Sequence, residues 1–296
     1  MSGAKDFLST ARLGRIKAYV NALSDVVDLQ FREDESLPRL PIDVRSVDKA
    51  EDSRVAHYLL LVASIDQGRL VGAAENARSI VCHLFKSFGD EVFGIEDVLT
   101  IRSIFPILPN PLIASILVSV NKFVERVAEG DLYSWGLQIT SQGLRPLDVA
   151  EQLASGIEWM GKDWNTTARK KVWMYMRWMV RPHPDIGLWQ GLGKSELYLP
   201  LDSNAGRFFE RIGVLPKETR LYSKKQVVET TMFVRDKLFP DDPAKIDYPA
   251  FLFGIDAALS KEAQRTQVTL HRFQVMDMKW WPGRKQLYRP LDFLTG

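Results

Sequence analysis

The fold of this chain is decided by residues 165–213, which open with NTTARKKVWMYMRWMVR at 165–181 and close with LPLDSNAGRFFERIG at 199–213. The first string is a polar segment that leads into an apolar helix, and the second is a proline-containing turn that leads into another helix. We expect Asn165 or a following threonine to cap the first helix and Asp202 to cap the second. Gly213 is the expected C-cap of the second helix.

A lysine and a carboxylate therefore stand near the starts of two helices. Lys170 would lie in the first turn, where the helix dipole opposes a positive charge and partial desolvation favours the neutral amine. Together with a carboxylate at Asp202, it suits attack by an amine beside a developing cation. Surface lysines and capping aspartates are also common without any chemistry, so these two residues alone leave both interpretations open.

The same residues resemble the catalytic core of the helix-hairpin-helix DNA glycosylase superfamily. In that superfamily a lysine opens a helix, and an aspartate follows a turn of the type apolar-Pro-apolar-Asp, as at residues 199–202 here. Asp202 follows Lys170 by 32 residues, a long interval that resembles the spacing in the archaeal 8-oxoguanine DNA glycosylases. Further segments resemble a less characterised prokaryotic family related to those enzymes, namely residues 176–181, 185–189 and 200–202.

The segment before the lysine departs from the superfamily's pattern. Members usually carry a Gly-apolar-Gly turn whose backbone N–H groups face a DNA phosphate, whereas residues 160–167 contain a single glycine. A modified hairpin is therefore expected, as in the archaeal group. The resemblance implies an all-α, two-lobed glycosylase fold that spans residues 1–296 as a single domain. Its lobes would lie at roughly residues 50–150 and 151–260, with the terminal segments packed on them.

The resemblance also assigns roles to polar residues elsewhere. An apolar helix followed by a polar turn resembles the element that reaches into the base pocket, with Gln67 as the matching group and Asp66 beside it. Asp247, near the start of the last core helix, would contact the base or the lysine. Such residues also commonly cap helices. The remaining expected base-pocket or DNA-binding residues are Lys162, Asn165, Thr166, Lys171 and Arg207.

The activity implied by the resemblance is removal of an oxidised purine, chiefly 8-oxoguanine, from damaged double-stranded DNA. Lys170 would attack C1′ of the flipped nucleotide and form a Schiff base, which permits β-elimination. Asp202 would stabilise positive charge on the sugar or help the lysine lose its proton. Lys171, about 100° further around the helix, is the alternative nucleophile. Two other functions stay open: a monofunctional glycosylase for another damaged base, and a catalytically inactive helical DNA-binding protein.

Composition excludes several classes of protein. Hydrophobic residues make up 46% of the 296 and charged residues 26%, which is typical of a globular chain rather than a disordered one. The single cysteine, Cys82, excludes a four-cysteine iron–sulfur cluster, and the four histidines lack metal-site spacing. We expect no cofactor and no metal. Neither a signal core nor a membrane-spanning run is evident, so a cytoplasmic, nucleoid-associated monomer is expected.

Basic residues are concentrated in two stretches of a chain whose net charge is only +2. Residues 162–181 contain six Lys or Arg against one Asp, a net charge of +5, and residues 261–296 contain seven against three acidic residues, a net charge of +4. Such stretches are typical of a phosphate-binding face and equally of a solvated helix surface.

Hydrophobic periodicity predicts a mostly helical chain with almost no strand-like alternation. Residues 128–145, which contain three glycines, are expected to form a looser connection. Three tryptophans near the proposed site are expected in the core: Trp173, Trp178 and Trp189. Further helices are expected at residues 6–32, from 48, at 71–88, at 113–124, from 146 and at 226–237.

Overall fold

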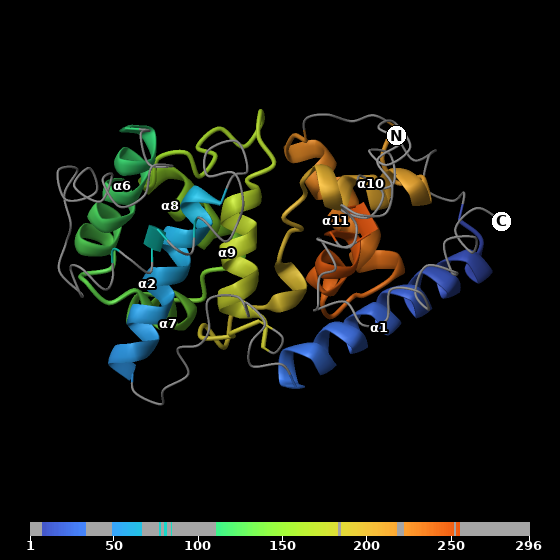
Figure 1. Ribbon diagram of the computed structural model, residues 1–296, viewed down its shortest axis with the longest axis horizontal. Coiled ribbons are helices and arrows are strands. Elements are labelled where there is room, and N and C mark those ends of the chain that lie inside the picture. The colour runs from blue at the N-terminus through green and yellow to red at the C-terminus, as the bar shows by residue number, and fades with distance from the viewer. Residues whose placement is uncertain are drawn as a thin grey trace, which may run out of the picture. The chain divides into compact units, whose positions relative to one another are not determined.

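The computed structural model describes residues 8–33, 49–66, 77, 80, 81, 84, 111–182, 185–217, 222–251, 253 and 254. Within these ranges every regular element is a helix and no strand occurs (Figure 1), which confirms the all-α class for this part of the chain. The elements are α1 (Thr10–Glu33), α2 (Lys49–Ile65), α6 (Pro111–Val127), α7 (Leu132–Ser141), α8 (Pro146–Gly156), α9 (Lys170–Val180), η2 (Lys194–Glu196), α10 (Ser203–Ile212), α11 (Lys224–Lys237) and η3 (Pro243–Ile246).

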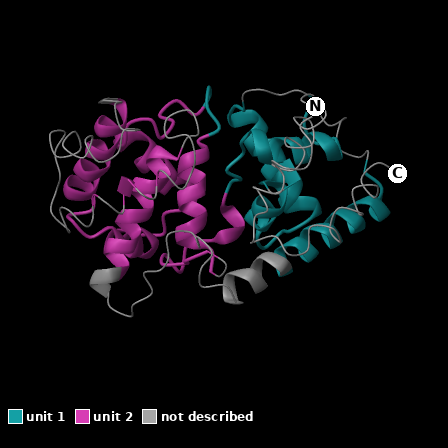
Figure 2. Ribbon diagram, in the orientation of Figure 1, with its two compact units in different colours: residues 1–37, 165–168, 198–296 teal, residues 38–164, 169–197 magenta. Residues whose placement is uncertain are grey.

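The chain divides into two compact units (Figure 2). Unit 1 consists of Met1–Leu37, Asn165–Ala168 and Tyr198–Gly296, and unit 2 consists of Pro38–Trp164 and Arg169–Leu197. Helix α9, which carries both lysines of interest, therefore belongs to unit 2. Helix α10, which follows Asp202, belongs to unit 1.

Unit 2 is built around α9. Every residue from Lys171 to Val180 is buried, and both α2 and α8 pack against this helix. The three tryptophans expected in the core, at positions 173, 178 and 189, are indeed buried. The ring of Trp189 lies edge-on to Tyr175, with the ring centroids 5.5 Å apart. A helix without a polar face is typical of a core element.

Helix α7 corrects the expectation of a loose connection at residues 128–145. Asp131 caps this helix by accepting a hydrogen bond from the backbone N–H of Ser134 at 3.0 Å. The glycine in its middle, Gly136, is explained by packing, because a Cβ there would lie 2.0 Å from Nε1 of Trp189. Gly136, which made a helix look unfavourable in the sequence, thus lets the indole of Trp189 pack against the helix backbone.

The chain after α9 folds back on the helix end. The backbone N–H groups of Ile186 and Gly187 both donate to the carbonyl of Trp178. Beneath this loop, two buried arginines share the fully buried carboxylate of Asp185. Arg181 Nη1 donates to Oδ2 at 2.5 Å, and Arg177 Nη2 lies 3.4 Å from Oδ1.

Unit 1 confirms both predicted ends of α10. The carboxylate of Asp202 accepts hydrogen bonds from the backbone N–H groups of Asn204 and Ala205, each at 2.9 Å. Gly213 ends the helix with a positive φ of 84°, a conformation that glycine adopts without steric cost. The apolar face of α10 is buried through Phe208, whose ring packs edge-on against neighbouring aromatic rings.

Candidate functional site

The start of α9 differs from the expected one. The helix begins at Lys170, and its N-cap is Arg169 rather than Asn165 or Thr166, both of which are exposed. Arg169 has a left-handed backbone with φ 51° and ψ 36°, and its own side chain makes no capping hydrogen bond. Lys170 is therefore the first helical residue, which confirms its expected place in the first turn.

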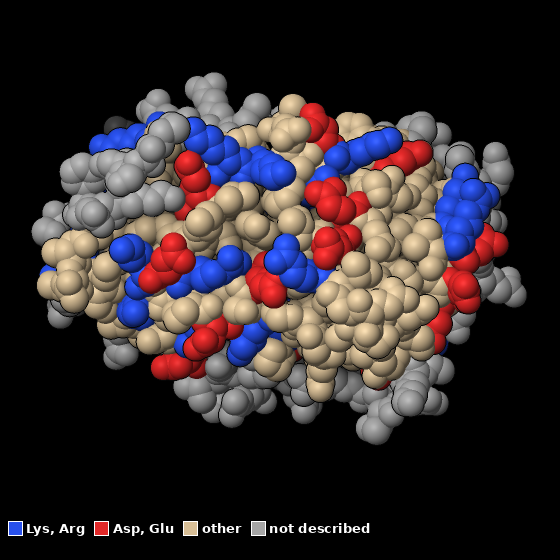
Figure 3. Space-filling view, turned by 180° about the vertical axis from the view of Figure 1, so that it is seen from behind, with Lys and Arg blue, Asp and Glu red and all other residues tan. Residues whose placement is uncertain are grey.

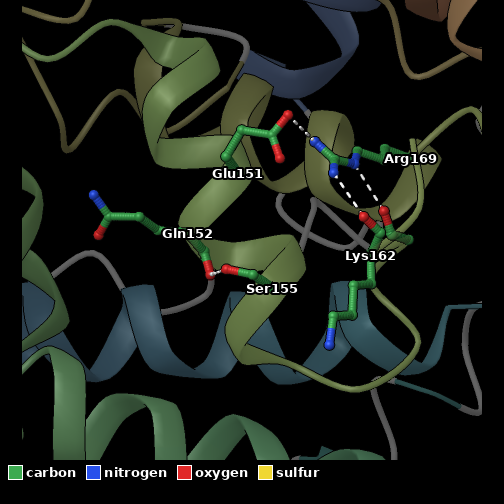
Figure 4. A network of polar contacts seen from close by, with 6 residues as sticks. Glu151, Gln152, Ser155, Lys162 and Arg169 are labelled. Carbon is green, nitrogen blue, oxygen red and sulfur yellow. Dashed lines mark hydrogen bonds and ion pairs between the residues drawn. The ribbon is translucent and has the colours of Figure 1, made fainter. Parts of the chain in front are cut away.

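The reason for this start is a long-range network around the Arg169 guanidinium (Figure 4). Nε donates to the carbonyl of Gly161 at 2.7 Å and Nη2 donates to the carbonyl of Lys162 at 3.0 Å. Nη1 pairs with Glu151 of α8 at 2.7 Å, and the guanidinium lies 5.0 Å from the ring centroid of Trp164. These contacts hold Arg169 in a backbone conformation that is uncommon for a residue with a side chain. Sequence reasoning missed this residue because no local pattern marks it.

Lys170 lies beside Asp66, a contact that the sequence did not predict. Asp66 directly follows the last residue of α2, and its Oδ2 is 3.9 Å from Nζ of Lys170. The Lys170 side chain is 32% exposed and that of Asp66 is 20% exposed. The side chain of Lys170 thus lies close to a carboxylate and remains partly exposed.

The side chain of Lys171, unlike that of Lys170, points into the protein interior. Its residue is buried, at 9% exposure, and its Nζ donates a 2.6 Å hydrogen bond to the backbone carbonyl of Ser64 in the last turn of α2. Burial lowers the pKa of Lys171 to about 8, while the nearby Asp66 raises this pKa and Lys170 lowers it. The sequence predicted a desolvated amine at Lys170, and the structure has it at Lys171 instead.

We expect Lys171→Met to stabilise the protein at neutral pH. With a pKa near 8 in the folded chain against an ordinary 10.5, wild-type Lys171 binds fewer protons folded than unfolded between these values, so wild-type stability rises with pH across that window. Below pH 8 the cost of burying the charge is fully present, about 3 kcal/mol, offset by about 1 kcal/mol for the hydrogen bond. The variant should therefore gain about 2 kcal/mol at pH 7.

Urea denaturation of both proteins at a series of pH values from about 6 to about 10 checks this expectation. The advantage of the variant should shrink as the pH rises above about 8. Lys194→Met, at an exposed lysine of η2, should show no such pH dependence. A difference between wild type and Lys171→Met that stays constant with pH would contradict the assignment of a buried ammonium.

The other predicted residues are found in several places. Gln67 lies outside the described residues. Lys162 is exposed and its side chain extends away from the Arg169 network (Figure 4). In unit 1, Arg207 of α10 donates through Nη1 to the side chain of Asn204 at 2.6 Å and to the carbonyl of Gly254 at 3.1 Å. Asp247, directly after η3, is buried.

The basic stretch at residues 162–181 is not an exposed phosphate-binding face. Four of its six cationic side chains are buried, and three of these four pair with carboxylates inside unit 2: Arg169, Arg177 and Arg181. Only Lys162 and Lys170 of the stretch are at all accessible. On the face shown in Figure 3, basic and acidic side chains are interspersed. Local charge in the sequence therefore overstates the positive surface.

Two other features are absent from the described residues. No cluster of three or more His, Cys, Asp or Glu side chains there could hold a metal ion. Nor is any helix in those same ranges long and apolar enough to cross a membrane.

Comparison with known proteins gives one match. A family model described as "Protein of unknown function (DUF2400)" matches residues 123–256. No curated protein matches the chain, and no solved structure does. The matched segment runs from the second half of α6 past α10 and η3, so it contains Lys170, Lys171 and Asp202, whereas Asp66 lies before it.

Proposed function

We propose that this protein is a DNA N-glycosylase and abasic-site lyase that removes an oxidised purine, 8-oxoguanine foremost, from double-stranded DNA. The observation that carries the proposal is the pair of lysines at the start of α9. One amine is partly exposed beside a carboxylate, and the other is buried behind it. Amine catalysis needs a lysine at a helix start or in a desolvated place, since both favour the neutral form.

Exposure decides which lysine is the proposed nucleophile. The side chain of Lys170 is 32% exposed, whereas Lys171 is buried and its Nζ is engaged with the carbonyl of Ser64. A sugar carbon must approach the amine to within about 3–3.5 Å before a bond can form. The partly exposed side chain of Lys170 favours such an approach, whereas the buried amine of Lys171 would first have to leave the carbonyl of Ser64.

The proposed reaction begins with a flipped nucleotide, since C1′ is inaccessible inside the duplex. Lys170 loses a proton, and Asp66 is the carboxylate that lies beside it. The neutral amine bonds to C1′ while the bond from C1′ to N9 breaks, and the purine leaves with that electron pair and takes up a proton. Asp202, as expected from the resemblance, would stabilise the positive charge on the sugar.

The second half of the proposed reaction cuts the strand. Opening of the sugar ring leaves a protonated imine between Lys170 and C1′. Loss of a proton from C2′ then expels the 3′ phosphate, and water hydrolyses the imine to return the free amine. This sequence needs no cofactor. It distinguishes the proposal from a monofunctional glycosylase, in which water attacks C1′ and no imine forms, and from an inactive DNA-binding protein.

Borohydride trapping on three duplexes tests the proposal. We expect wild-type protein to form a covalent adduct with DNA that carries 8-oxoguanine or an abasic site, and none with undamaged DNA. Asp202→Asn keeps an N-cap acceptor and removes the charge, so it isolates the role of that carboxylate. Base release without any adduct would favour the monofunctional alternative. Binding without either product would favour the inactive one.

A further inference from the structure

Lys171 connects two helices at the point where the proposed nucleophile lies. Its side chain leaves α9, and its Nζ donates a 2.6 Å hydrogen bond to the carbonyl of Ser64. Ser64 is two residues before Asp66, whose Oδ2 is 3.9 Å from Nζ of Lys170. The amine of Lys171 thus fixes the end of α2, from which Asp66 extends, against the start of α9.

Stability does not explain this buried amine. Burial lowers the pKa of Lys171 to about 8, so the charged form disfavours folding at neutral pH. A methionine would fill a similar volume without a charge and without that cost. A buried charge that opposes folding, next to an accessible amine and a carboxylate, is therefore a candidate for a role in chemistry rather than in stability.

The three charged groups also act on one another. The carboxylate of Asp66 raises the pKa of Lys171, and the charge of Lys170 lowers it, so Asp66 interacts with both lysines. If Lys171 lost its charge, Asp66 would interact with Lys170 alone and a like charge beside Lys170 would disappear. Both changes strengthen the attraction between the carboxylate of Asp66 and the charged side chain of Lys170.

We propose that Lys171 is a positioning residue for the reaction of Lys170. It holds the last turn of α2 against α9, and through its own charge it prevents Asp66 from pairing with Lys170 alone. The catalytic meaning of this role rests on the proposed function. The effect on the Lys170 amine holds whether or not DNA is the substrate.

Reductive methylation measures that effect without DNA. Formaldehyde forms an imine with a lysine amine, as an abasic sugar would, and cyanoborohydride reduces this imine to a stable methylamine. Initial rates at Lys170 in the full-length chain are read by fragment-resolved mass spectrometry and normalised to the exposed Lys194. We expect Lys171→Met to slow methylation of Lys170 about fivefold, the size expected for one neighbouring unit charge at a partly exposed site.

A matched control separates positioning from a general loosening of the two helices. Tyr175 of α9 also donates to a carbonyl of α2, that of Ala56, at 3.3 Å. Tyr175→Phe removes this hydrogen bond and leaves the lysines in place, so methylation of Lys170 should stay within about twofold of wild type. Lys171→Met should also melt at a higher temperature than wild type at pH 7 while its Lys170 reacts more slowly, a combination that a purely structural role would not produce.

Three results would overturn the inference. The first is an unchanged or faster methylation of Lys170 in Lys171→Met, and the second is an equal slowing in Tyr175→Phe. The third is a trapped DNA adduct that is lost in Lys171→Met and persists in Lys170→Ala, because Lys171 would then be the nucleophile itself. A wild-type protein that forms no adduct with abasic DNA refutes the proposed function, and the methylation rates still decide the role of Lys171.

Discussion

Lys170→Ala is expected to abolish the trapped adduct on abasic DNA, with a loss of about 10³-fold or more in its rate of formation, as is usual when a covalent nucleophile is removed. The reason is that the only partly exposed amine at the start of α9 disappears, while the buried amine of Lys171 stays bonded to the carbonyl of Ser64. Single-turnover trapping at saturating protein measures the effect, because it separates the chemical step from binding.

Lys170→Arg is the matched variant for charge. A guanidinium keeps the positive charge beside Asp66 but does not lose its proton in proteins, so it forms no Schiff base. DNA binding should therefore be retained in Lys170→Arg and the adduct lost. An adduct that persists at the wild-type rate in Lys170→Ala would show that another lysine is the nucleophile.

Asp185→Ala is expected to destabilise the protein by about 3–5 kcal/mol, the range for a buried ion pair that loses one partner. The carboxylate of Asp185 is fully buried and interacts with both Arg177 and Arg181, which are almost fully buried themselves. Its removal leaves two guanidinium charges inside unit 2 without the carboxylate between them. The loop at residues 185–189, which closes the end of α9, would lose its anchor at the same time.

Urea denaturation at pH 7 measures this effect through the shift in the midpoint. Glu125→Ala, at an exposed acidic residue of α6 in the same unit, is the control and should change the free energy of unfolding by no more than about 0.5 kcal/mol. The double variant Arg181→Met with Asp185→Ala should be less destabilised than the sum of the two single variants, because one of the stranded charges is removed. A wild-type midpoint in Asp185→Ala would contradict the buried cluster.

Local signals in the sequence predicted the ends of α10 correctly. An aspartate after a proline turn can accept hydrogen bonds from the first free N–H groups of a helix, and a glycine after an apolar stretch can adopt a positive φ. Both events involve residues a few positions apart, so the sequence contains all the information they need. Asp202 and Gly213 accordingly take the predicted roles.

The start of α9 could not be predicted in the same way. Asn165 and Thr166 are good local caps, but the contacts that decide the helix start join Arg169 to Glu151, eighteen residues earlier, and to the carbonyls of the intervening loop. Local capping is worth about 1 kcal/mol, and a buried guanidinium with several partners outweighs it. Helix α7 was missed for a related reason, since only the distant Trp189 explains Gly136.

Charge was the least reliable signal. Lys171, Arg177 and Arg181 have the sequence appearance of a solvated basic face, yet all three are buried. Their partners, a helix-end carbonyl and a single loop carboxylate, are visible only in three dimensions. The contact between Asp66 and Lys170 was likewise not predicted, because the sequence paired Lys170 with Asp202 and placed Asp66 beside Gln67.

The burial of α9 from Lys171 to Val180 determines when the backbone around the proposed nucleophile becomes ordered. Backbone amides in a buried helix exchange with solvent only when a large cooperative part of the structure opens. Helix α9, whose first residue is Lys170, should therefore fluctuate little between such openings. The backbone that carries Lys170 is then ordered during folding rather than when a ligand arrives. Preorganisation of this kind leaves less rotational entropy to be lost at the moment of reaction.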